Sequence, residues 1–283
     1  MNRIGVVGTG RIGFGTAQLV GDGCFGPSRD RAGAVDVLRR AVDLGVRFVD
    51  TAANYGPFVA EELVAEALHP YADGVFVASK CGVERVGPNA TRHAGRPEAL
   101  RAEVEGSVRR LRVERIDLMQ LHRIDPDVPL ADQLGALVDM REAGLIAEIG
   151  LDTVTVDRLD AALALAPIVS VQNRYNVRER ADDDVLAACE RAGVVFLPWY
   201  PLGNGAALAD PAVVEVAARH GVSAARVAIA WLLHRSPAIL PTPGTRSPDH
   251  LADNLAASSL RLDPVDLADL DRAHVDRVGD AAR

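Results

Sequence analysis

Cysteine is scarce in this sequence, and the few cysteines do not form a recognisable framework. The 283 residues contain three of them, Cys24, Cys81 and Cys189, which are far apart and odd in number. Small secreted domains that depend on disulfides carry many paired cysteines, so this usage favours a reducing compartment. The seven histidines show no HExxH or similar ligand spacing, and we therefore predict no metal site.

Long hydrophobic runs are also absent. No stretch approaches the ~18 consecutive apolar residues of a membrane-spanning helix, and the N-terminus lacks the apolar core of a signal peptide. The formal net charge of -8 argues against a surface that binds nucleic acid. Together these absences predict a cytoplasmic protein without a membrane or nucleic-acid partner. The 48% hydrophobic and 25% charged residues are typical of a globular enzyme.

What the sequence does contain is an alternation of two patterns. Short apolar runs lie at residues 13–20, 46–51, 75–80, 116–122, 146–151, 168–173, 194–199 and 239–243. Segments of helical period lie at residues 31–44, 97–111, 130–143, 156–165, 182–192, 223–234 and 266–275. Fully apolar runs are typical of strands buried on both faces of a parallel sheet. Eight of them in a chain of this length predict an α/β fold, a single (β/α)8 TIM barrel domain over residues 1–283.

The N-terminal glycines offer a competing interpretation. Gly8, Gly10 and Gly13 match the GxGxxG pattern of a dinucleotide-binding turn, which requires a helix directly after it. Residues 14–27 instead contain four more glycines and a proline, and each glycine inside a helix costs about 1 kcal/mol. We therefore predict a short N-terminal hairpin that leads into the first barrel strand, and no cofactor role for Gly8 or Gly10. A Rossmann-type dehydrogenase is the alternative.

Titratable residues close three of the predicted strands. Asp50, Lys80 and His122 each lie at or beside the end of an apolar run. Tyr55 lies five residues beyond Asp50, in the following loop. A charged group at the end of a buried strand is costly unless it is paired. Because the carboxyl ends of barrel strands meet at one mouth, we expect these four side chains to share one polar site.

The segments around these four residues resemble the catalytic-site segments of the aldo-keto reductase superfamily. They read FVDTAANYG, FVASK and LMQLHR. Three further segments, SVQNRYN, PWYPLGNG and LPTPGTRSPDHLADN, are similar to other family segments in the same order and spacing. The resemblance runs from about Gly13 to Leu260. Within the superfamily, the chain is most similar to short bacterial members of the pyridoxal reductase or pyridoxine 4-dehydrogenase type.

The resemblance implies reduction of a small aldehyde or ketone, pyridoxal being one candidate, with NADPH as the cofactor and NADH as a second one to test. It makes Tyr55 the proton donor. Lys80 would lower the pKa of Tyr55, and Asp50 would hold Lys80 charged and in place. His122 would donate a hydrogen bond to the carbonyl oxygen and orient it.

The resemblance also implies residues for the nicotinamide end of the cofactor. Trp199 would stack on the nicotinamide ring, and Gln172 would hold the carboxamide. Pro201 and Leu202 follow in the same matched segment. Asp152 stands where many relatives carry a serine. An aspartate can accept a hydrogen bond from the carboxamide but cannot donate one, so the nicotinamide would be placed differently.

The last matched segment corresponds to the adenosine-phosphate end of the cofactor. Its residues are Gly244, Arg246, His250 and Asn254. Arg246 is the residue expected to bind the 2′-phosphate, because a guanidinium suits bidentate phosphate contacts. Asn254 would hydrogen-bond the adenine. Many relatives have lysine at the position of Gly244 and arginine or glutamine at that of His250, so the strength of the preference for NADPH is left open.

Several alternatives stay open at the level of sequence. The chain could be a cofactor-binding regulatory subunit that keeps the fold without physiological turnover. Predicted loops at residues 21–30, 81–96 and 123–129 would surround the substrate. The second of them carries several basic residues, which suit an anionic substrate or simply a solvated surface. The substrate, the favoured direction and the choice between a monomer and a small homo-oligomer are not determined.

Overall fold

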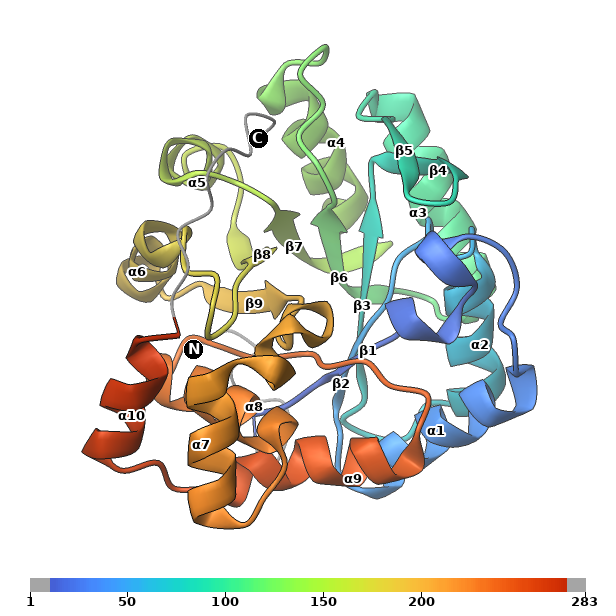
Figure 1. Cartoon of the computed structure of the whole chain (residues 1–283). Coiled ribbons are helices and arrows are strands. Elements are labelled where there is room, and N and C mark those ends of the chain that lie inside the picture. The colour runs from blue at the N-terminus through green and yellow to red at the C-terminus, as the bar shows by residue number, and fades with distance from the viewer. Residues whose placement is uncertain (1–10, 274–283) are drawn as a thin grey trace.

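The computed structural model describes residues 11–273, and its centre is a parallel sheet of seven strands inside a ring of helices (Figure 1). The strand order is β1-β2-β3-β6-β7-β8-β9. Their bounds are β1 Phe14–Gly15, β2 Phe48–Asp50, β3 Phe76–Cys81, β6 Ile116–Leu121, β7 Ile146–Asp152, β8 Ile168–Arg174 and β9 Val195–Trp199. Every neighbouring pair is parallel. The sheet curls, and the predicted (β/α)8 class is confirmed.

The sheet is closed by an extended segment in place of a regular eighth strand. We predicted a strand at residues 239–243, and this prediction is wrong in detail. The N–H of Leu240 donates to the carbonyl of Phe196 on β9, and the N–H of Gly13 donates to the carbonyl of Pro241, both at 2.9 Å. Because a proline has no N–H to donate, the segment cannot form a full ladder. It still joins β9 to the start of β1 and so completes the barrel.

Ten α-helices lie in the described part of the chain and cover the outside of the strands. They are α1 Arg31–Asp43, α2 Val59–Leu68, α3 Pro97–Leu111, α4 Leu130–Glu142, α5 Val156–Leu163, α6 Asp183–Ala192, α7 Pro211–His220, α8 Ala224–Arg235, α9 Pro248–Ala256 and α10 Pro264–Asp271. The sequence prediction missed α2, α7 and α9. Two of these carried a usable signal, since Asp210-Pro211 and Ser247-Pro248 each place a capping residue before proline at the first helical position.

The N-terminal part of the barrel is less regular than the apolar run at residues 13–20 suggested. Strand β1 has two residues and is followed by two short 3-10 turns, Ala17–Leu19 and Asp22–Cys24. The first α-helix begins only at Arg31. Residues 14–30 therefore lack the helix that a Rossmann turn requires after Gly13. Gly8, Gly10 and the predicted hairpin lie outside the described residues.

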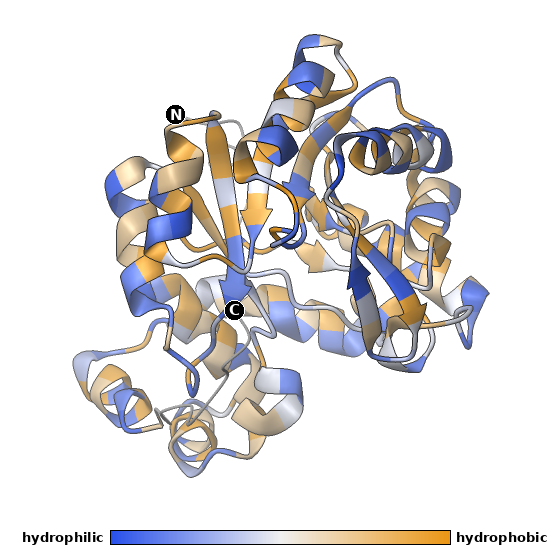
Figure 2. Cartoon of the chain, turned by 90° about the horizontal axis from the view of Figure 1, so that it is seen from above, coloured by the Kyte–Doolittle hydropathy of each residue, from blue (hydrophilic) through white to orange (hydrophobic). Residues whose placement is uncertain are grey.

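The inward faces of the strands change from apolar to polar along the barrel axis. Phe48, Phe76, Ala78, Leu118, Leu197 and Leu240 form a small hydrophobic cluster that is separate from the main core between sheet and helices. Phe48 and Phe76 stack with their ring centroids 5.6 Å apart. Strands are accordingly mostly orange in Figure 2, whereas the helices show both colours. Because side chains alternate along a strand, the inward position after Phe48 is Asp50, and a polar layer follows the apolar one.

The segment at residues 81–96, which we predicted as a loop, contains a β-hairpin. Strands β4 Val83–Gly87 and β5 Ala90–His93 pair antiparallel and follow directly on β3. Apolar residues do not alternate regularly over residues 81–96, which explains why no strand was predicted in this segment. Among residues 11–273, no helix is long and apolar enough to cross a membrane.

Candidate active site

The polar layer at the carboxyl ends of the strands is built around Asp50. The Nζ of Lys80 donates to both carboxylate oxygens of Asp50 at 2.8 Å, and to the carbonyl of Thr51 at 3.0 Å. The side-chain amides of Gln120 and Gln172 donate to Asp50 at 3.3 and 3.2 Å. Lys80 is 1% exposed and Asp50 is 4% exposed. The carboxylate thus accepts four hydrogen bonds from three side chains, which offset the cost of burying it.

The same pairing keeps Lys80 charged. Burial alone would lower the pKa of this ammonium, but the adjacent Asp50 carboxylate outweighs that effect, and the pKa of Lys80 is raised above its ordinary value. The positive charge is therefore fixed at neutral pH, inside the barrel and directly below the mouth.

Tyr55 lies above this charge, in the loop between β2 and α2. Its hydroxyl is 3.4 Å from the Nζ of Lys80, and Nζ is 5.1 Å from the centroid of its ring. Burial raises the pKa of Tyr55 to about 12, although Lys80 acts in the opposite direction. We predicted a net lowering, and this is wrong because the desolvation of the phenol outweighs the attraction of the ammonium. Tyr55 is therefore a neutral phenol at pH 7.

His122 follows the last residue of β6 and faces the phenol. Its backbone N–H donates to the carbonyl of Cys81 at 2.8 Å, which extends the pairing of β3 and β6 by one residue. The rings of Tyr55 and His122 pack edge to face with centroids 6.2 Å apart. Burial, together with the charges of Lys80 and two arginines, lowers the pKa of His122 well below its ordinary value. The imidazole is therefore neutral at pH 7.

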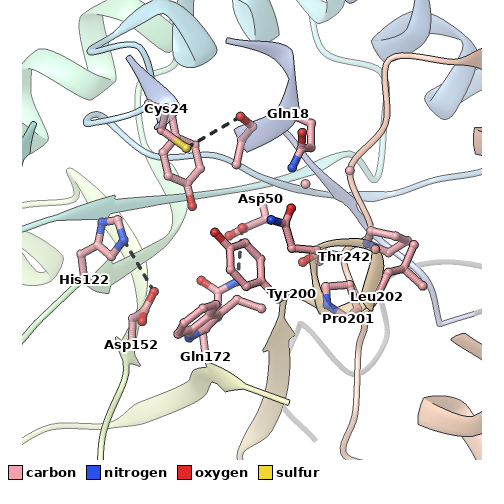
Figure 3. Close-up of a pocket in the computed structure, with 18 of the residues that line it drawn as sticks. Gln18, Cys24, Asp50, His122, Asp152, Gln172, Tyr200, Pro201, Leu202 and Thr242 are labelled. Carbon is pink, nitrogen blue, oxygen red and sulfur yellow. Dashed lines mark hydrogen bonds and ion pairs between the residues drawn. The ribbon is translucent and has the colours of Figure 1, made fainter. Parts of the chain in front are cut away.

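A cavity of about 320 Å³ opens above these groups, and most of the predicted site residues line it. The predicted residues on its wall are Asp50, Tyr55, His122, Asp152, Gln172, Trp199, Pro201, Leu202 and Gly244. Figure 3 shows the side chains of His122, Asp152 and Gln172 pointing into the cavity from neighbouring strands, opposite Gln18 and Cys24 from the N-terminal turns. Lys80 lies beneath the wall. The structure thus brings the four predicted catalytic residues together.

Two buried polar atoms on the nicotinamide side of the cavity have no hydrogen-bond partner in the described protein. They are the Oε1 of Gln172 and the Nε1 of Trp199. A buried polar atom without a partner is costly, and a ligand can supply the missing one. The Nε2 of Gln172 is held by Asp50, so its Oε1 is free to accept from an amide N–H. These residues fit the carboxamide of a nicotinamide.

Asp152 is engaged in a way that the sequence did not show. Its carboxylate accepts from the Nη1 of Arg123 at 2.5 Å and from the hydroxyl of Thr153 at 2.7 Å, and it lies 3.8 Å from the Nε2 of His122. Burial raises the pKa of Asp152, and Arg123 works against this rise. Because both of its oxygens already face protein groups, Asp152 is poorly placed to be the main acceptor for a carboxamide.

The residues predicted for the adenosine end lie at the start of α9. Gly244, Arg246 and His250 line a second hollow of about 280 Å³ together with Gln18 and Ser247. The hydroxyl of Ser247 caps α9, and both Arg246 and His250 are exposed. An arginine beside a helix N-terminus suits a phosphate, because the N–H groups and the guanidinium attract the same charge. Asn254 is buried one turn further along α9 and lines neither hollow.

Sequence reasoning missed several residues of the cavity wall or the layer below it. They include Gln18, Gln120 and Tyr200, whereas Cys24, Arg85 and Arg123 lie in the predicted substrate loops but were not singled out as site residues. Gln120 could have been found, because it lies two positions before His122 on the same face of a strand. Cys24 and Arg85 reach the site on the predicted loop segments, but no local pattern shows which side chain of such a segment lines the cavity. Within residues 11–273, no group of three or more His, Cys, Asp or Glu is arranged to hold a metal ion.

A parallel barrel with a buried Asp-Lys pair, a phenol and an imidazole at its mouth defines the class of protein: a barrel enzyme with its active site at the carboxyl ends of the strands. A family model described as the aldo/keto reductase family matches residues 11–274. The chain therefore belongs to the aldo/keto reductase family, and the family resemblance predicted from the sequence is confirmed. It is an oxidoreductase that uses a nicotinamide cofactor.

Individual relatives agree with this assignment. The chain is 43% identical over 271 residues to an uncharacterised oxidoreductase of Schizosaccharomyces pombe, covering 95% of this chain and 88% of that protein. It is 38% identical over 274 residues to the pyridoxine 4-dehydrogenase of Escherichia coli, covering 95% and 96%. An aldo-keto reductase from Klebsiella pneumoniae in complex with NADPH superposes with a TM-score of 0.80 at 26% identity, covering 93% and 90%. The glycerol dehydrogenase of Gluconobacter oxydans superposes with a TM-score of 0.84 at 26% identity, covering 96% and 94%.

Proposed function

We propose that this protein reduces a small aldehyde or ketone to the alcohol with NADPH, and that Tyr55 donates the proton. The observation that carries the proposal is the position of the neutral Tyr55 hydroxyl. It lies on the wall of the cavity, 3.4 Å from the Nζ of the charged Lys80 beneath that wall. When bound, the dihydronicotinamide supplies a hydride to the carbonyl carbon. The chain's own residues then have to hold the substrate and deliver a proton to its oxygen.

Tyr55 and Lys80 act as one unit in this proposal. At neutral pH the phenol holds its proton, which is the state that reduction requires of a donor. As the proton leaves, negative charge develops on the phenol oxygen beside the Nζ of Lys80. A fixed ammonium in a site of low dielectric stabilises that charge without any rearrangement. Asp50 has a positioning role, because it holds Lys80 in place and charged.

His122 orients the substrate in the proposed reaction. A neutral imidazole can donate one hydrogen bond to a carbonyl oxygen without adding a further positive charge next to Lys80. Its ring faces that of Tyr55 across 6.2 Å, so both groups can address a carbonyl placed between them. Two donors to one oxygen would stabilise the charge that develops there as the hydride arrives.

The cofactor is held at two ends in the proposal. Gln172 accepts from the carboxamide through its unpartnered Oε1, and the indole of Trp199 offers a flat face to the ring. Arg246 binds the 2′-phosphate at the start of α9, which gives a preference for NADPH over NADH. Pyridoxal is the first substrate to test, because the similar Escherichia coli protein is a pyridoxine 4-dehydrogenase.

The proposal is tested by following the oxidation of NADPH with a panel of carbonyls that includes pyridoxal, aromatic aldehydes and sugar-derived ketones. We expect turnover of at least one aldehyde, which Tyr55→Phe abolishes while NADPH still binds. A protein that binds NADPH tightly and turns over no carbonyl in the panel would instead be the cofactor-binding regulatory subunit that the sequence left open.

A further inference from the structure

The β4–β5 hairpin brings a basic residue to the mouth of the barrel. Along β4, Val83, Arg85 and Gly87 are turned inward, whereas Glu84 and Val86 are exposed. This alternation is the one expected when one face of a hairpin rests on the protein. Arg85 lines the same cavity as the groups proposed for catalysis.

Arg85 is anchored to the loop that carries Tyr55. Its Nε donates to the carbonyl of Asn54 at 3.4 Å, next to Tyr55 in the chain. Its charge also reaches the reacting groups. It is one of the cationic side chains that, together with burial, lower the pKa of His122, and it opposes the rise in the pKa of Cys24. Within residues 11–273, the Nη atoms of Arg85 have no hydrogen-bond partner, so they can face a ligand.

The charges of the cavity wall do not balance. Asp50 is paired with Lys80, and Asp152 is paired with Arg123. In the part of the chain that the structure describes, Arg85 forms no ion pair with a carboxylate. The nearest acidic residue of its own hairpin, Glu84, points outward and is engaged with Arg92. The cavity therefore carries one uncompensated positive charge in a protein whose overall formal charge is -8.

Arg85 lies away from the residues proposed to bind the adenosine end of the cofactor. The hairpin and α9 lie on opposite sides of the barrel in Figure 1. Arg246 and the N-terminus of α9 already offer a site for the nucleotide phosphate there. An anion bound at Arg85 would consequently belong to the substrate. The half-buried guanidinium is planar, and its N–H groups suit the oxygens of a carboxylate or a phosphate.

We propose that Arg85 is a specificity-determining residue that selects carbonyl substrates bearing an anionic group, a carboxylate or a phosphate monoester. The inference rests on the proposed carbonyl reduction and names its substrate class. The aldehyde lies against Tyr55 and His122, and the acidic group lies against Arg85 on the hairpin side of the same cavity.

The test compares matched pairs of aldehydes in the wild type, Arg85→Gln and Arg92→Gln. One pair is 4-carboxybenzaldehyde with 4-methylbenzaldehyde, and the other is pyridoxal 5′-phosphate with pyridoxal. The ratio of kcat/KM, anionic over neutral, should fall about tenfold or more in Arg85→Gln, the size of effect expected for a hydrogen bond between charged groups. Arg92→Gln changes a hairpin arginine that does not line the cavity, and should leave both ratios within about twofold of the wild type, as expected of a surface ion pair. If the ratio falls for only one of the two pairs, the result identifies whether Arg85 binds the carboxylate or the phosphate.

A binding measurement separates this inference from the proposed reaction. Calorimetry with 4-carboxybenzyl alcohol, the product of the first aldehyde, on the NADPH-loaded protein reports binding without turnover, because neither the alcohol nor the reduced cofactor can accept a hydride. Weaker binding by Arg85→Gln, but not by Arg92→Gln, supports the inference even if no aldehyde is reduced. Unchanged kcat/KM ratios for both aldehyde pairs, or equal Kd values for the alcohol in all three proteins, would overturn it.

Discussion

At the scale of single residues, the proposed function depends on a phenol whose pKa is set by two opposing effects. Burial raises the pKa of Tyr55 to about 12, and Lys80 pulls it down. A donor that stays protonated well above neutral pH is suited to reduction. The reverse reaction needs the phenolate, which the same Lys80 stabilises only once the proton has left. In the proposed reaction, the proton therefore stays on Tyr55 until negative charge appears on the substrate oxygen.

Tyr55→Phe should keep the fold and the binding of NADPH, because it removes one hydroxyl from the cavity wall. The rate of hydride transfer should fall by ~10²–10⁴, the range typical of lost general acid catalysis. Lys80→Met should give a related loss, and the double variant should be little worse than either single one, since both disable one proton-transfer unit. Single-turnover kinetics measures all three. Reduction by Tyr55→Phe at the wild-type rate would contradict the mechanism.

Arg246→Ala should weaken the binding of NADPH more than that of NADH. The 2′-phosphate is present on NADPH alone, and a charge-assisted hydrogen bond contributes ~1.5–3 kcal/mol, which corresponds to a tenfold or larger change in Kd. Fluorescence titration with both cofactors checks this. Equal losses for the two cofactors would show that Arg246 does not read the phosphate. Arg261→Ala serves as the control, because it removes the same charge from an exposed arginine that lines neither of the two hollows.

The depressed pKa of His122 predicts a flat pH profile around neutrality. The imidazole stays neutral as the pH falls through 6.5, so kcat/KM for a neutral aldehyde should show no inflection near that value. As the pH falls, His122 is protonated in the unfolded chain at about pH 6.5, and in the folded chain only at a lower pH. This histidine therefore lowers the stability of the fold only below about pH 6.5. An activity limb with a pKa near 6.5 that disappears in His122→Gln would disprove the assignment. Steady-state kinetics between pH 5.5 and about 8 decides it.

At the scale of elements, the site depends on turns that fix the ends of the strands. The turn after β3 is held by α3, where the carboxylate of Glu103 accepts from the backbone N–H of Gly82 at 2.7 Å. This turn connects Cys81 to the hairpin that carries Arg85. Burial raises the pKa of Glu103 to about 7, although the hydrogen bond from Gly82 lowers it. The connection between the barrel and the hairpin therefore contains a carboxyl group that titrates near neutrality.

Glu103→Gln should alter the pH dependence of stability. Between the unfolded value near 4.5 and the folded value near 7, the folded state holds this proton more tightly, so stability falls as the pH rises through that interval. The variant keeps an oxygen for Gly82 but cannot ionise. It should nearly match the wild type at about pH 4 and be more stable at about pH 8, by no more than about 3 kcal/mol. Urea unfolding at both pH values measures the difference. A matched control is Glu105→Gln, whose side chain is 44% exposed, and an identical response from it would contradict the argument.

At the scale of the whole molecule, closure of the barrel links the first strand to a segment more than 200 residues later in the chain. The segment around Leu240 and Pro241 bonds to β9 on one side and to Gly13 on the other. Residues that are far apart in the sequence therefore form neighbouring parts of the barrel wall. We infer that the described barrel unfolds as one domain, because a strand that left the closed sheet would deprive both of its neighbours of their hydrogen-bond partners.

Thermal unfolding should accordingly show one transition, and NADPH should raise its midpoint. A ligand at 100 times its Kd stabilises the folded state by about 2.7 kcal/mol, so the shift should be larger with NADPH than with the same concentration of NADH. Calorimetry, with circular dichroism as a second probe, tests both statements. Two separate transitions would contradict the single domain, and light scattering on the same samples would show whether the protein is a monomer or a small homo-oligomer.

Much of this molecule could be predicted from local patterns. Each buried strand from β2 to β9 of the barrel was found within about two residues of its bounds, because a run of apolar residues needs only its own segment to be recognised. The positions of Asp50, Lys80 and His122 followed from their place at the ends of those runs. The closing segment was misjudged, because prolines and backbone geometry decide whether an apolar run can form a ladder.

By itself, then, the sequence determined the alternation of strands and helices, the family, and which side chains stand at the mouth. The tertiary structure alone decided their state. The sign of the shift in the pKa of Tyr55, the pairing of Asp152 with Arg123, and the approach of Arg85 on a hairpin all depend on distances between segments that are far apart in the chain. Burial and Coulomb interactions depend on such distances, and a local pattern of residues does not contain them.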